Sequence, residues 1–349
     1  MKKITALTAS AAVSIGMTSA LTSAPCAAED TSSPVRIMCI GDSITDGYGT
    51  AGSYRKFLCH GLAVKGFSVD MTGSKGGGWL PEYTDEVTGE TFSYDDENTG
   101  YSGYAIKEYS GRNGIYETLV STGCLSAEPD IVILQIGTND VIDRYELDSA
   151  GERLSQLISY ILGNIPSDSA LFVTTIPDLE PNRKDVYDWF GNYRHTADWQ
   201  TFFTDEEAAA AVNGAVEKYN SDLKNTVISM QSEHSNLYLG DVNSVITDTA
   251  SQLKDGVHPN DTGFRLMGEY WTGIISEHLS PGSISEKEWR MSDAVRLSNY
   301  LLGRNSTGFT HEEYIRYDLD GDDYLSGFDL TLLRSEILEK IISAGPYTE

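Results

Sequence analysis

The stretch of sequence that decides the fold is Ile131-Val132-Ile133-Leu134-Gln135-Ile136-Gly137-Thr138-Asn139-Asp140. Its apolar part is nearly continuous, as in a parallel strand that is buried on both faces. A glycine and small polar residues follow at once, which is typical of a turn. The stretch therefore predicts a strand inside a parallel sheet, with polar side chains at its carboxyl end.

Short apolar runs alternate with helical periodicity on both sides of this stretch. We expect strands at Val35–Ile40, Ser68–Thr72, Ile131–Gln135, Leu171–Thr175 and Leu237–Leu239. We expect helices at Tyr54–Lys65, Ala150–Asn164, Asp205–Gln231 and Thr262–Leu279. This alternation predicts an α/β fold, with a doubly wound parallel sheet, helices on both faces and a ligand site beyond the carboxyl ends of the strands.

The chain has 349 residues, which corresponds to roughly two domains of about 150 residues each. It carries 25 Lys and Arg against 52 Asp and Glu, a net charge of −27. Such a field repels phosphate backbones and anionic lipid surfaces, so we expect no nucleic acid and no membrane among its partners. A neutral substrate or a divalent cation fits this charge better.

Two boundaries divide the chain. Lys2 and Lys3 precede a stretch rich in Ser, Thr and Ala that ends at Cys26-Ala27-Ala28, in the order of a secretory signal peptide. Its apolar core is too weak for a membrane span. The second boundary falls at Ser280-Pro281-Gly282-Ser283. We therefore expect a secreted, extracellular protein with a signal peptide at 1–28, a catalytic domain at 34–279, a linker at 280–285 and a second unit at 286–349.

Removal of the signal peptide leaves three cysteines, Cys39, Cys59 and Cys124. An odd number means that at least one thiol is free or pairs between molecules. Cys39 lies inside an expected strand, where it acts as a small buried hydrophobe.

Two long insertions, at residues 74–103 and 177–204, interrupt the alternation of strands and helices. Loops of this length in a compact domain are usually functional. They contain the aromatic residues Trp79, Tyr83, Phe92, Tyr94 and Tyr101, then Tyr187, Trp189, Phe190, Tyr193, Trp199, Phe202 and Phe203. These rings either fasten the insertions to the core or form a sugar-stacking platform beside the site.

The first expected strand leads into Gly41-Asp42-Ser43-Ile44-Thr45-Asp46-Gly47. A serine in a turn between a strand and a helix exposes its hydroxyl close to backbone N–H groups, as a nucleophile requires. The alternative is an ordinary turn in which Ser43 caps a helix. Other segments must decide between the two.

A serine nucleophile needs a base, and the candidates are His60, His195, His234, His258, His278 and His311. His258 lies in the tight loop Asp255-Gly256-Val257-His258, where the aspartate can accept a hydrogen bond from Nδ1 and fix the tautomer. We assign His60, His195 and His278 to packing or to the surface, and His311 belongs to the second unit.

An acyl transfer also needs hydrogen-bond donors for the oxyanion. Asn139 follows the strand Ile131–Gln135, so its side-chain amide can project from the same sheet edge as Ser43. Gly73, at the end of the second strand, can offer a backbone N–H, and Ser43 can offer another.

These segments resemble the four ordered blocks of the SGNH (GDSL-type) hydrolases, namely Gly41-Asp42-Ser43, Gly73, Gly137-Thr138-Asn139-Asp140 and Asp255-Gly256-Val257-His258. The stretches Ile40–Gly47, Met71–Ser74, Tyr101–Ile106 and Pro129–Asp140 are similar to carbohydrate esterase family 3, the acetylxylan esterases. The resemblance implies Ser43 as nucleophile, His258 as base and Asp255 as its orienting group. It also implies an oxyanion hole of Ser43, Gly73 and Asn139, and no cofactor for catalysis.

The second unit contains the stretch Asp318–Asp329, whose carboxylates have the spacing of a calcium loop. Asp318, Asp320, Asp322 and Asp329 occupy loop positions 1, 3, 5 and 12, and the backbone carbonyl of Tyr324 occupies position 7. Asp323 stands where an EF-hand has glycine, and Asp329 stands where it has glutamate. We expect one Ca²⁺ here.

This loop and the following Leu330–Leu338 resemble a dockerin repeat, and residues 292–303 resemble the helix of a first repeat that lacks a calcium loop. The resemblance implies a small all-α, dockerin-like domain that binds a cohesin module of a cellulosome-like scaffold.

We therefore expect a secreted serine esterase that removes acetyl groups from acetylated xylan. One alternative is an SGNH lipase, a thioesterase or another polysaccharide deacetylase. A second is a non-catalytic, scaffold-attached protein that binds carbohydrate through its aromatic insertions.

Overall fold

The computed structural model describes residues 34–77, 80–180 and 204–279, and in the C-terminal part residues 294, 297–298, 300–302, 317, 319 and 325–343. The expected signal peptide at 1–28 and linker at 280–285 lie outside the described residues. Within these ranges, no helix combines the length and the apolarity needed to cross a bilayer.

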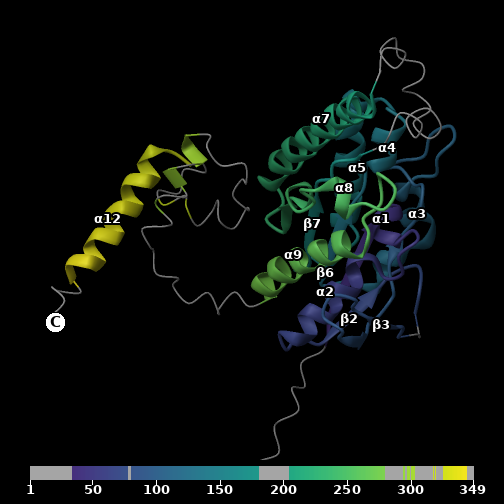
Figure 1. Ribbon diagram of the computed structural model, residues 1–349, viewed down its shortest axis with the longest axis horizontal. Coiled ribbons are helices and arrows are strands. Elements are labelled where there is room, and N and C mark those ends of the chain that lie inside the picture. The colour runs from purple at the N-terminus through teal and green to yellow at the C-terminus, as the bar shows by residue number, and fades with distance from the viewer. Residues whose placement is uncertain are drawn as a thin grey trace, which may run out of the picture. The chain divides into compact units, whose positions relative to one another are not determined.

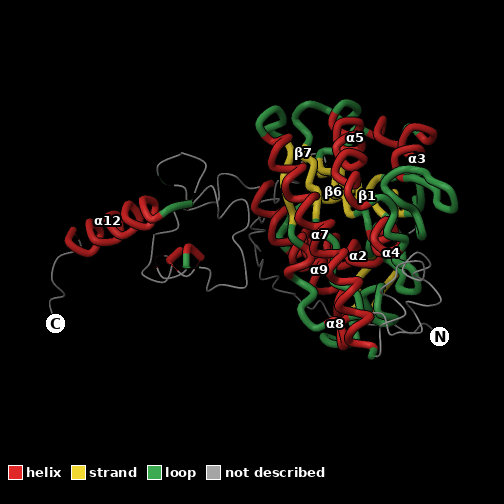
Figure 2. Tube along the Cα trace, turned by 90° about the horizontal axis from the view of Figure 1, so that it is seen from above, coloured by secondary structure: helices red, strands yellow, loops and turns green. Residues whose placement is uncertain are grey.

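The centre of the fold is a parallel sheet with the strand order β2-β1-β6-β7-β8. Its strands are β1 (Val35–Gly41), β2 (Val69–Thr72), β6 (Ile131–Gln135), β7 (Ala170–Thr174) and β8 (Leu237–Gly240), and the short β5 (Thr99–Gly100) pairs with the end of β1. Figure 2 shows β7, β6 and β1 side by side. The strand order reverses between β1 and β6, so the carboxyl ends of these two strands flank the crevice where such sheets bind ligands.

Helices cover both faces of the sheet (Figure 1). Helices α2 (Ser53–Val64) and α9 (Asp261–Leu279) pack together on one face. The other face carries α3 (Ile115–Thr122), α5 (Ala150–Leu162) and α7 (Asp205–Gln231). The expected strands and helices of the catalytic domain are all present, with bounds that differ from the expectation by at most two residues.

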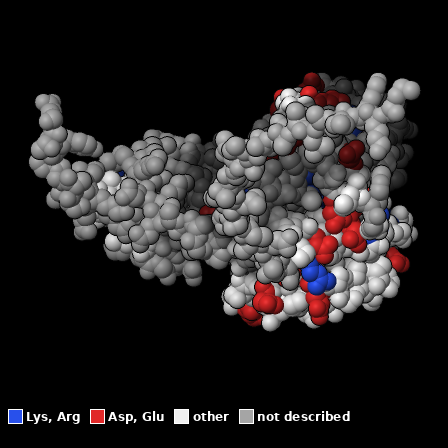
Figure 3. Space-filling model, turned by 90° about the horizontal axis from the view of Figure 1, so that it is seen from below, with Lys and Arg blue, Asp and Glu red and all other residues white. Residues whose placement is uncertain are grey.

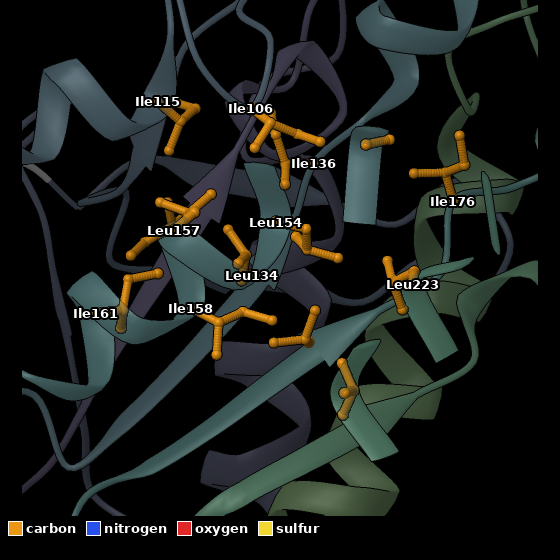
Figure 4. Close-up of a cluster of buried hydrophobic side chains, with 14 of the residues drawn as sticks. Ile106, Ile115, Leu134, Ile136, Leu154, Leu157, Ile158, Ile161, Ile176 and Leu223 are labelled. Carbon is orange, nitrogen blue, oxygen red and sulfur yellow. The ribbon is translucent and has the colours of Figure 1, made fainter. Parts of the chain in front are cut away.

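The strands are buried on both faces because successive side chains enter different cores. Ile37 and Cys39 pack with α2 and α9, whereas Met38 and Ile40 pack with α3, α5 and α7. Figure 4 shows the second core, in which α5 side chains surround Leu134 of β6. Full burial of one Leu or Ile contributes about 2 kcal/mol. This double burial explains the unbroken apolar run in β6.

The first insertion forms an antiparallel hairpin of β3 (Glu82–Thr84) and β4 (Thr91–Ser93), which was not expected. Its rings face α2, since Tyr83 lies 5.5 Å from Phe57 and Phe92 stacks on His60 at 4.0 Å between ring centroids. The described rings of this insertion therefore fasten it to the core. The other insertion rings, Trp79, Tyr187, Trp189, Phe190, Tyr193, Trp199, Phe202 and Phe203, lie outside the described residues.

The three cysteines expected in the mature chain are all free thiols. Cys39 is fully buried in β1, and this burial raises the pKa of its thiol to about 12. The expectation of a small buried hydrophobe is confirmed.

Among the charged side chains visible in Figure 3, acidic ones are more prominent than basic ones, in line with the net charge of −27. Basic groups on the described part are often paired, as Lys224 is with Asp241 at 3.0 Å. The surplus of acid is therefore a property of the surface.

The described C-terminal residues are helical or lie beside helices, with α12 (Gly327–Ser343) as the longest element. They form a small apolar cluster of Ala294, Leu297, Tyr317, Leu325, Leu333 and Ile337. Leu297 and Leu333 are fully buried in it. This cluster is separate from the two cores of the sheet.

Candidate active site

The turn after β1 places Ser43 at the carboxyl edge of the sheet. Ser43 is the first residue of α1 (Ser43–Asp46), and the cap of this helix is Asp42, whose carboxylate accepts the N–H of Ile44 at 3.0 Å. The alternative in which Ser43 serves as the cap is therefore wrong. A Cβ on Gly41 would lie 2.2 Å from the carbonyl oxygen of Gln135, so β1 and β6 can approach this closely only with glycine here.

The Asp255 side chain stabilises the loop before α9 through hydrogen bonds to the backbone. Oδ1 of Asp255 accepts the backbone N–H of Val257 at 3.2 Å and that of His258 at 2.8 Å. Gly256 has φ +77°, a left-handed conformation that glycine adopts without strain. The tight turn brings the imidazole of His258 back onto the carboxylate of Asp255.

The structure brings Ser43, His258 and Asp255 into one chain of hydrogen bonds. His258 Nδ1 lies 2.8 Å from Asp255 Oδ2, and His258 Nε2 lies 2.9 Å from Ser43 Oγ. A carboxylate can only accept, so Nδ1 carries the proton and Nε2 is left to accept the serine hydroxyl. This arrangement can remove the proton from Ser43 as its oxygen attacks.

The electrostatics of the loop favour a charged Asp255. Burial opposes ionisation, but hydrogen bonds from the His258 side chain and backbone outweigh it and keep the pKa of Asp255 below its ordinary value. Asp42, which is fully buried beside the nucleophile, behaves differently, because burial raises its pKa against the opposing N–H of Ile44. Of these two carboxyls, Asp255 is the one whose surroundings favour the charged form, and that form stabilises an imidazolium.

Asn139 and Gly73 lie at the same sheet edge as Ser43, because β1 pairs with β6 on one side and with β2 on the other. Neither residue hydrogen-bonds to Ser43, His258 or Asp255 within the described part of the chain. The Asn139 amide donates to the carbonyl of Tyr104 at 2.8 Å, which leaves its second proton for another acceptor. A Cβ on Gly73 would lie 2.2 Å from the carbonyl oxygen of Asn98, so this position accepts only glycine.

The residue after Asn139 takes part in a buried ion pair. Asp140 is fully buried, accepts the N–H of Ile106 at 3.0 Å and pairs with Arg153 Nη2 at 3.1 Å. Burial raises the pKa of Asp140 to about 6, against the pull of Ile106 and Arg153. Asp140 belongs to the Gly137–Asp140 block, but no motif predicts its pairing with Arg153, which lies on α5.

Another residue absent from the expectations is Tyr48, whose ring centroid lies 4.8 Å from that of His258. It follows the Gly41–Gly47 block directly, so its position in the sequence was an available signal. His60 and His278 pack against aromatic rings, as expected. His195 and His311 lie outside the described residues.

Of the expected calcium ligands, Asp318, Asp320, Asp322 and Tyr324 lie outside the described residues. Asp329 is described and fully buried, and its carboxylate accepts the N–H of Leu319 at 2.8 Å and that of Ser326 at 2.7 Å. The expected calcium site stays a prediction.

One group of carboxylates in the catalytic domain also has the geometry to hold a cation. Oxygens of Asp70, Asp95 and Glu97 all lie within 4.8 Å of one another. Burial raises the pKa of both Asp95 and Glu97, and repulsion from Asp70 and Asp96 raises both further. No motif in the sequence predicts a role for these three residues.

Comparisons with known proteins bear on the same region. Over 345 residues, 97% of its length, the chain is 34% identical to a protein of Ruminococcus flavefaciens named "Multidomain esterase", and it spans 39% of that protein.

Two solved structures are similar to about 71% of the chain. One is a "Clostridium thermocellum family 3 carbohydrate esterase", with 23% identity, 99% of that chain covered and a TM-score of 0.48. The other is a "carbohydrate esterase family 3 from Talaromyces cellulolyticus", with 20% identity, full coverage (100%) of that chain and a TM-score of 0.49.

A family described as "GDSL-like Lipase/Acylhydrolase" matches residues 37–271. The match spans more than half of the chain and includes both Ser43 and His258. This chain therefore belongs to the GDSL-like lipase/acylhydrolase family.

Proposed function

We propose that this protein is a secreted serine esterase that removes acetyl groups from xylan-type hemicellulose. The observation that carries the proposal is the chain of contacts from Ser43 Oγ through His258 to Asp255, at 2.9 Å and 2.8 Å. These are the distances over which a base can take a proton from a nucleophile.

In the proposed reaction, Ser43 Oγ attacks the ester carbonyl while its proton moves to His258 Nε2. Asp255 orients the imidazole and stabilises the positive charge that it acquires. Collapse of the tetrahedral intermediate breaks the bond to the sugar oxygen, which takes the proton from His258. Water, deprotonated by His258, then attacks the acyl-enzyme and releases acetate.

The oxyanion of each tetrahedral intermediate is stabilised by the N–H groups of Ser43 and Gly73 and by the Asn139 side chain. Removal of one such donor typically costs about 3 kcal/mol of transition-state stabilisation. The contact of Asn139 with the Tyr104 carbonyl supports this role, because it fixes the direction of the amide before substrate arrives.

An acetylated carbohydrate is the substrate that the sequence blocks favour. The family to which the chain belongs contains acylhydrolases, which supports ester cleavage in general. A neutral polysaccharide is also compatible with a net charge of −27, whereas a phosphorylated or sulfated one would be repelled.

The decisive experiment measures acetate release from a panel of acetylated polysaccharides by the parent protein and by Ser43→Ala. We expect Ser43→Ala to lose about 10⁴-fold in turnover and to keep its fold. Ser121→Ala, on the exposed side of α3, is the matched control and should behave as the parent. Retained turnover in Ser43→Ala would contradict the assignment.

The same panel separates the alternatives. Preference for long-chain esters or thioesters over acetylated xylan would indicate a lipase or thioesterase. Polysaccharide binding without any ester hydrolysis by the parent would indicate a non-catalytic carbohydrate-binding protein.

We further propose that the C-terminal unit binds one Ca²⁺ and docks to a cohesin module. The support is the spacing of Asp318, Asp320, Asp322 and Asp329 in the sequence. Calorimetric titration of the full chain with Ca²⁺ tests it. Binding should be lost in Asp318→Ala and retained in Asp323→Ala, because Asp323 is at a loop position that does not provide a ligand. Equal binding by both variants would remove the calcium loop from the proposal.

A further inference from the structure

Tyr48 stands out among the aromatic residues because its side chain is exposed. Its exposed fraction is 51%, and it is the only aromatic among the exposed large hydrophobic side chains of the described residues. Single exposed apolar side chains are common on protein surfaces, so exposure alone assigns no role to Tyr48. What distinguishes Tyr48 is that its exposed ring lies beside His258.

The backbone ties Tyr48 to the nucleophile. Its N–H donates to the carbonyl oxygen of Ser43 at 3.0 Å, alongside that of Gly47 at 2.9 Å. Gly47 has φ +87° and Gly49 has φ +67°, conformations that let the chain turn sharply on both sides of the ring. The ring is thus fixed by the same turn that presents Ser43.

The His258 loop holds the other side of Tyr48. The two ring centroids are 4.8 Å apart with an interplanar angle of 37°. Lys254 donates through Nζ to the Tyr48 carbonyl, and its own N–H donates to the His258 carbonyl at 2.9 Å. Its ammonium also lies 5.3 Å from the centre of the Tyr48 ring. Tyr48 therefore borders the reacting groups with part of its ring fixed and the rest open.

The chemistry of such a ring suits a sugar. One face of a pyranose presents C–H bonds in an apolar patch, which packs on an aromatic ring, while its hydroxyls stay in water. Tyr83 and Phe92 of the first insertion instead pack against Phe57 and His60 of α2. We infer that the sugar ring bearing the scissile acetyl group stacks on Tyr48. This inference rests on the proposed function.

The test compares Tyr48→Ala and Tyr48→Phe with the parent on two acetyl esters. One is an acetylated xylooligosaccharide, and the other is ethyl acetate, which has no ring to stack. We expect the ratio of kcat/KM for the sugar ester to that for ethyl acetate to fall by about threefold to tenfold in Tyr48→Ala, mainly through KM. Tyr48→Phe keeps the ring and should keep the ratio. Val120→Ala, which truncates a side chain of equal exposure on α3, should leave both activities unchanged.

Equal losses on both esters, with a changed pH profile, would show that Tyr48 acts only by positioning His258, and the inference would be wrong. An unchanged ratio would also overturn it.

A binding measurement separates the role of Tyr48 from the proposed esterase activity. Binding of the acetylated oligosaccharide is measured calorimetrically in Ser43→Ala and in Ser43→Ala with Tyr48→Ala. Weaker binding in the double variant supports the platform even if the parent cleaves no ester, and equal binding contradicts it even if the parent is an active esterase.

Discussion

Asp255 and Asp329 both accept backbone N–H groups, but in opposite directions along the chain and in different surroundings. Asp255 accepts the N–H of His258, three positions later in a loop, whereas Asp329 accepts that of Ser326, three positions earlier at the start of α12. The second oxygen of Asp255 contacts an imidazole, whereas that of Asp329 accepts the backbone N–H of Leu319. Both carboxylates hold a local backbone fold, and only the one that also meets an imidazole can assist catalysis.

Of the variants that test this difference, Asp255→Asn should have the largest effect, and that effect is on catalysis. Asp255→Asn keeps the shape of the side chain but removes the charge that fixes the His258 tautomer, so we expect kcat to fall by about 10³-fold to 10⁴-fold. Steady-state kinetics on a small acetyl ester measures this. Asp329→Asn is the control and should retain the parent kcat. A loss of less than tenfold in Asp255→Asn would mean that its role is confined to the turn.

Asp140 is a third carboxylate to compare with Asp255 and Asp329. It is as fully buried as Asp329, but it is next to Asn139 in the active-site turn. Its pKa of about 6 in the folded chain is above the ordinary 3.8, so the folded chain retains a proton that the unfolded chain releases. Its stabilising contribution is therefore complete below about pH 4 and is lost as the pH rises past 6. Relative to the parent, Asp140→Asn should cost about 2 kcal/mol more in free energy of unfolding at pH 4 than at pH 7.

Urea unfolding of both proteins at pH 4, 5.5 and 7 provides the measurement. Comparison with the non-titrating variant cancels other carboxyls such as Asp255, whose lowered pKa acts in the opposite direction. A difference that is constant with pH would show that Asp140 is already ionised throughout, as a simple ion pair with Arg153.

The smallest expected effect concerns the start of α12. Asp329→Ala removes the acceptor for the N–H groups of Ser326 and Leu319, a loss of about 1 kcal/mol that is local to the helix. Hydrogen exchange of α12 amides in the full chain should accelerate about fivefold. Asp255→Asn should leave the exchange of α12 unchanged, and an effect there would mean that the two regions are coupled.

The sheet could be predicted because its strands are buried on both faces and their apolar runs are nearly continuous. The hairpin of β3 and β4 could not, because exposed polar residues such as Glu82 and Thr91 interrupt any apolar pattern. Its stability comes instead from rings that meet α2, and that contact joins segments distant in the sequence.

The site divides in the same way. Asp255 and His258 are close in the sequence, so their spacing could predict their contact. The pairing of Asp140 with Arg153 depends on how α5 packs, and the exposure of Tyr48 depends on what surrounds it in space. No local motif predicts either the ion pair or the exposure of the ring. The roles of Ser43, Gly73 and Asn139 stay predictions until the variants are measured.

The contact between Ser43 and His258 joins residues that are 215 positions apart. Such a contact forms only when both ends of the domain have reached the same sheet edge, and closing so long a loop is slow compared with forming a helix. During refolding, ester turnover should therefore recover later than helical circular dichroism. Recovery of ester turnover would then mark the late step of folding in which the Ser43 turn and the His258 loop come into contact.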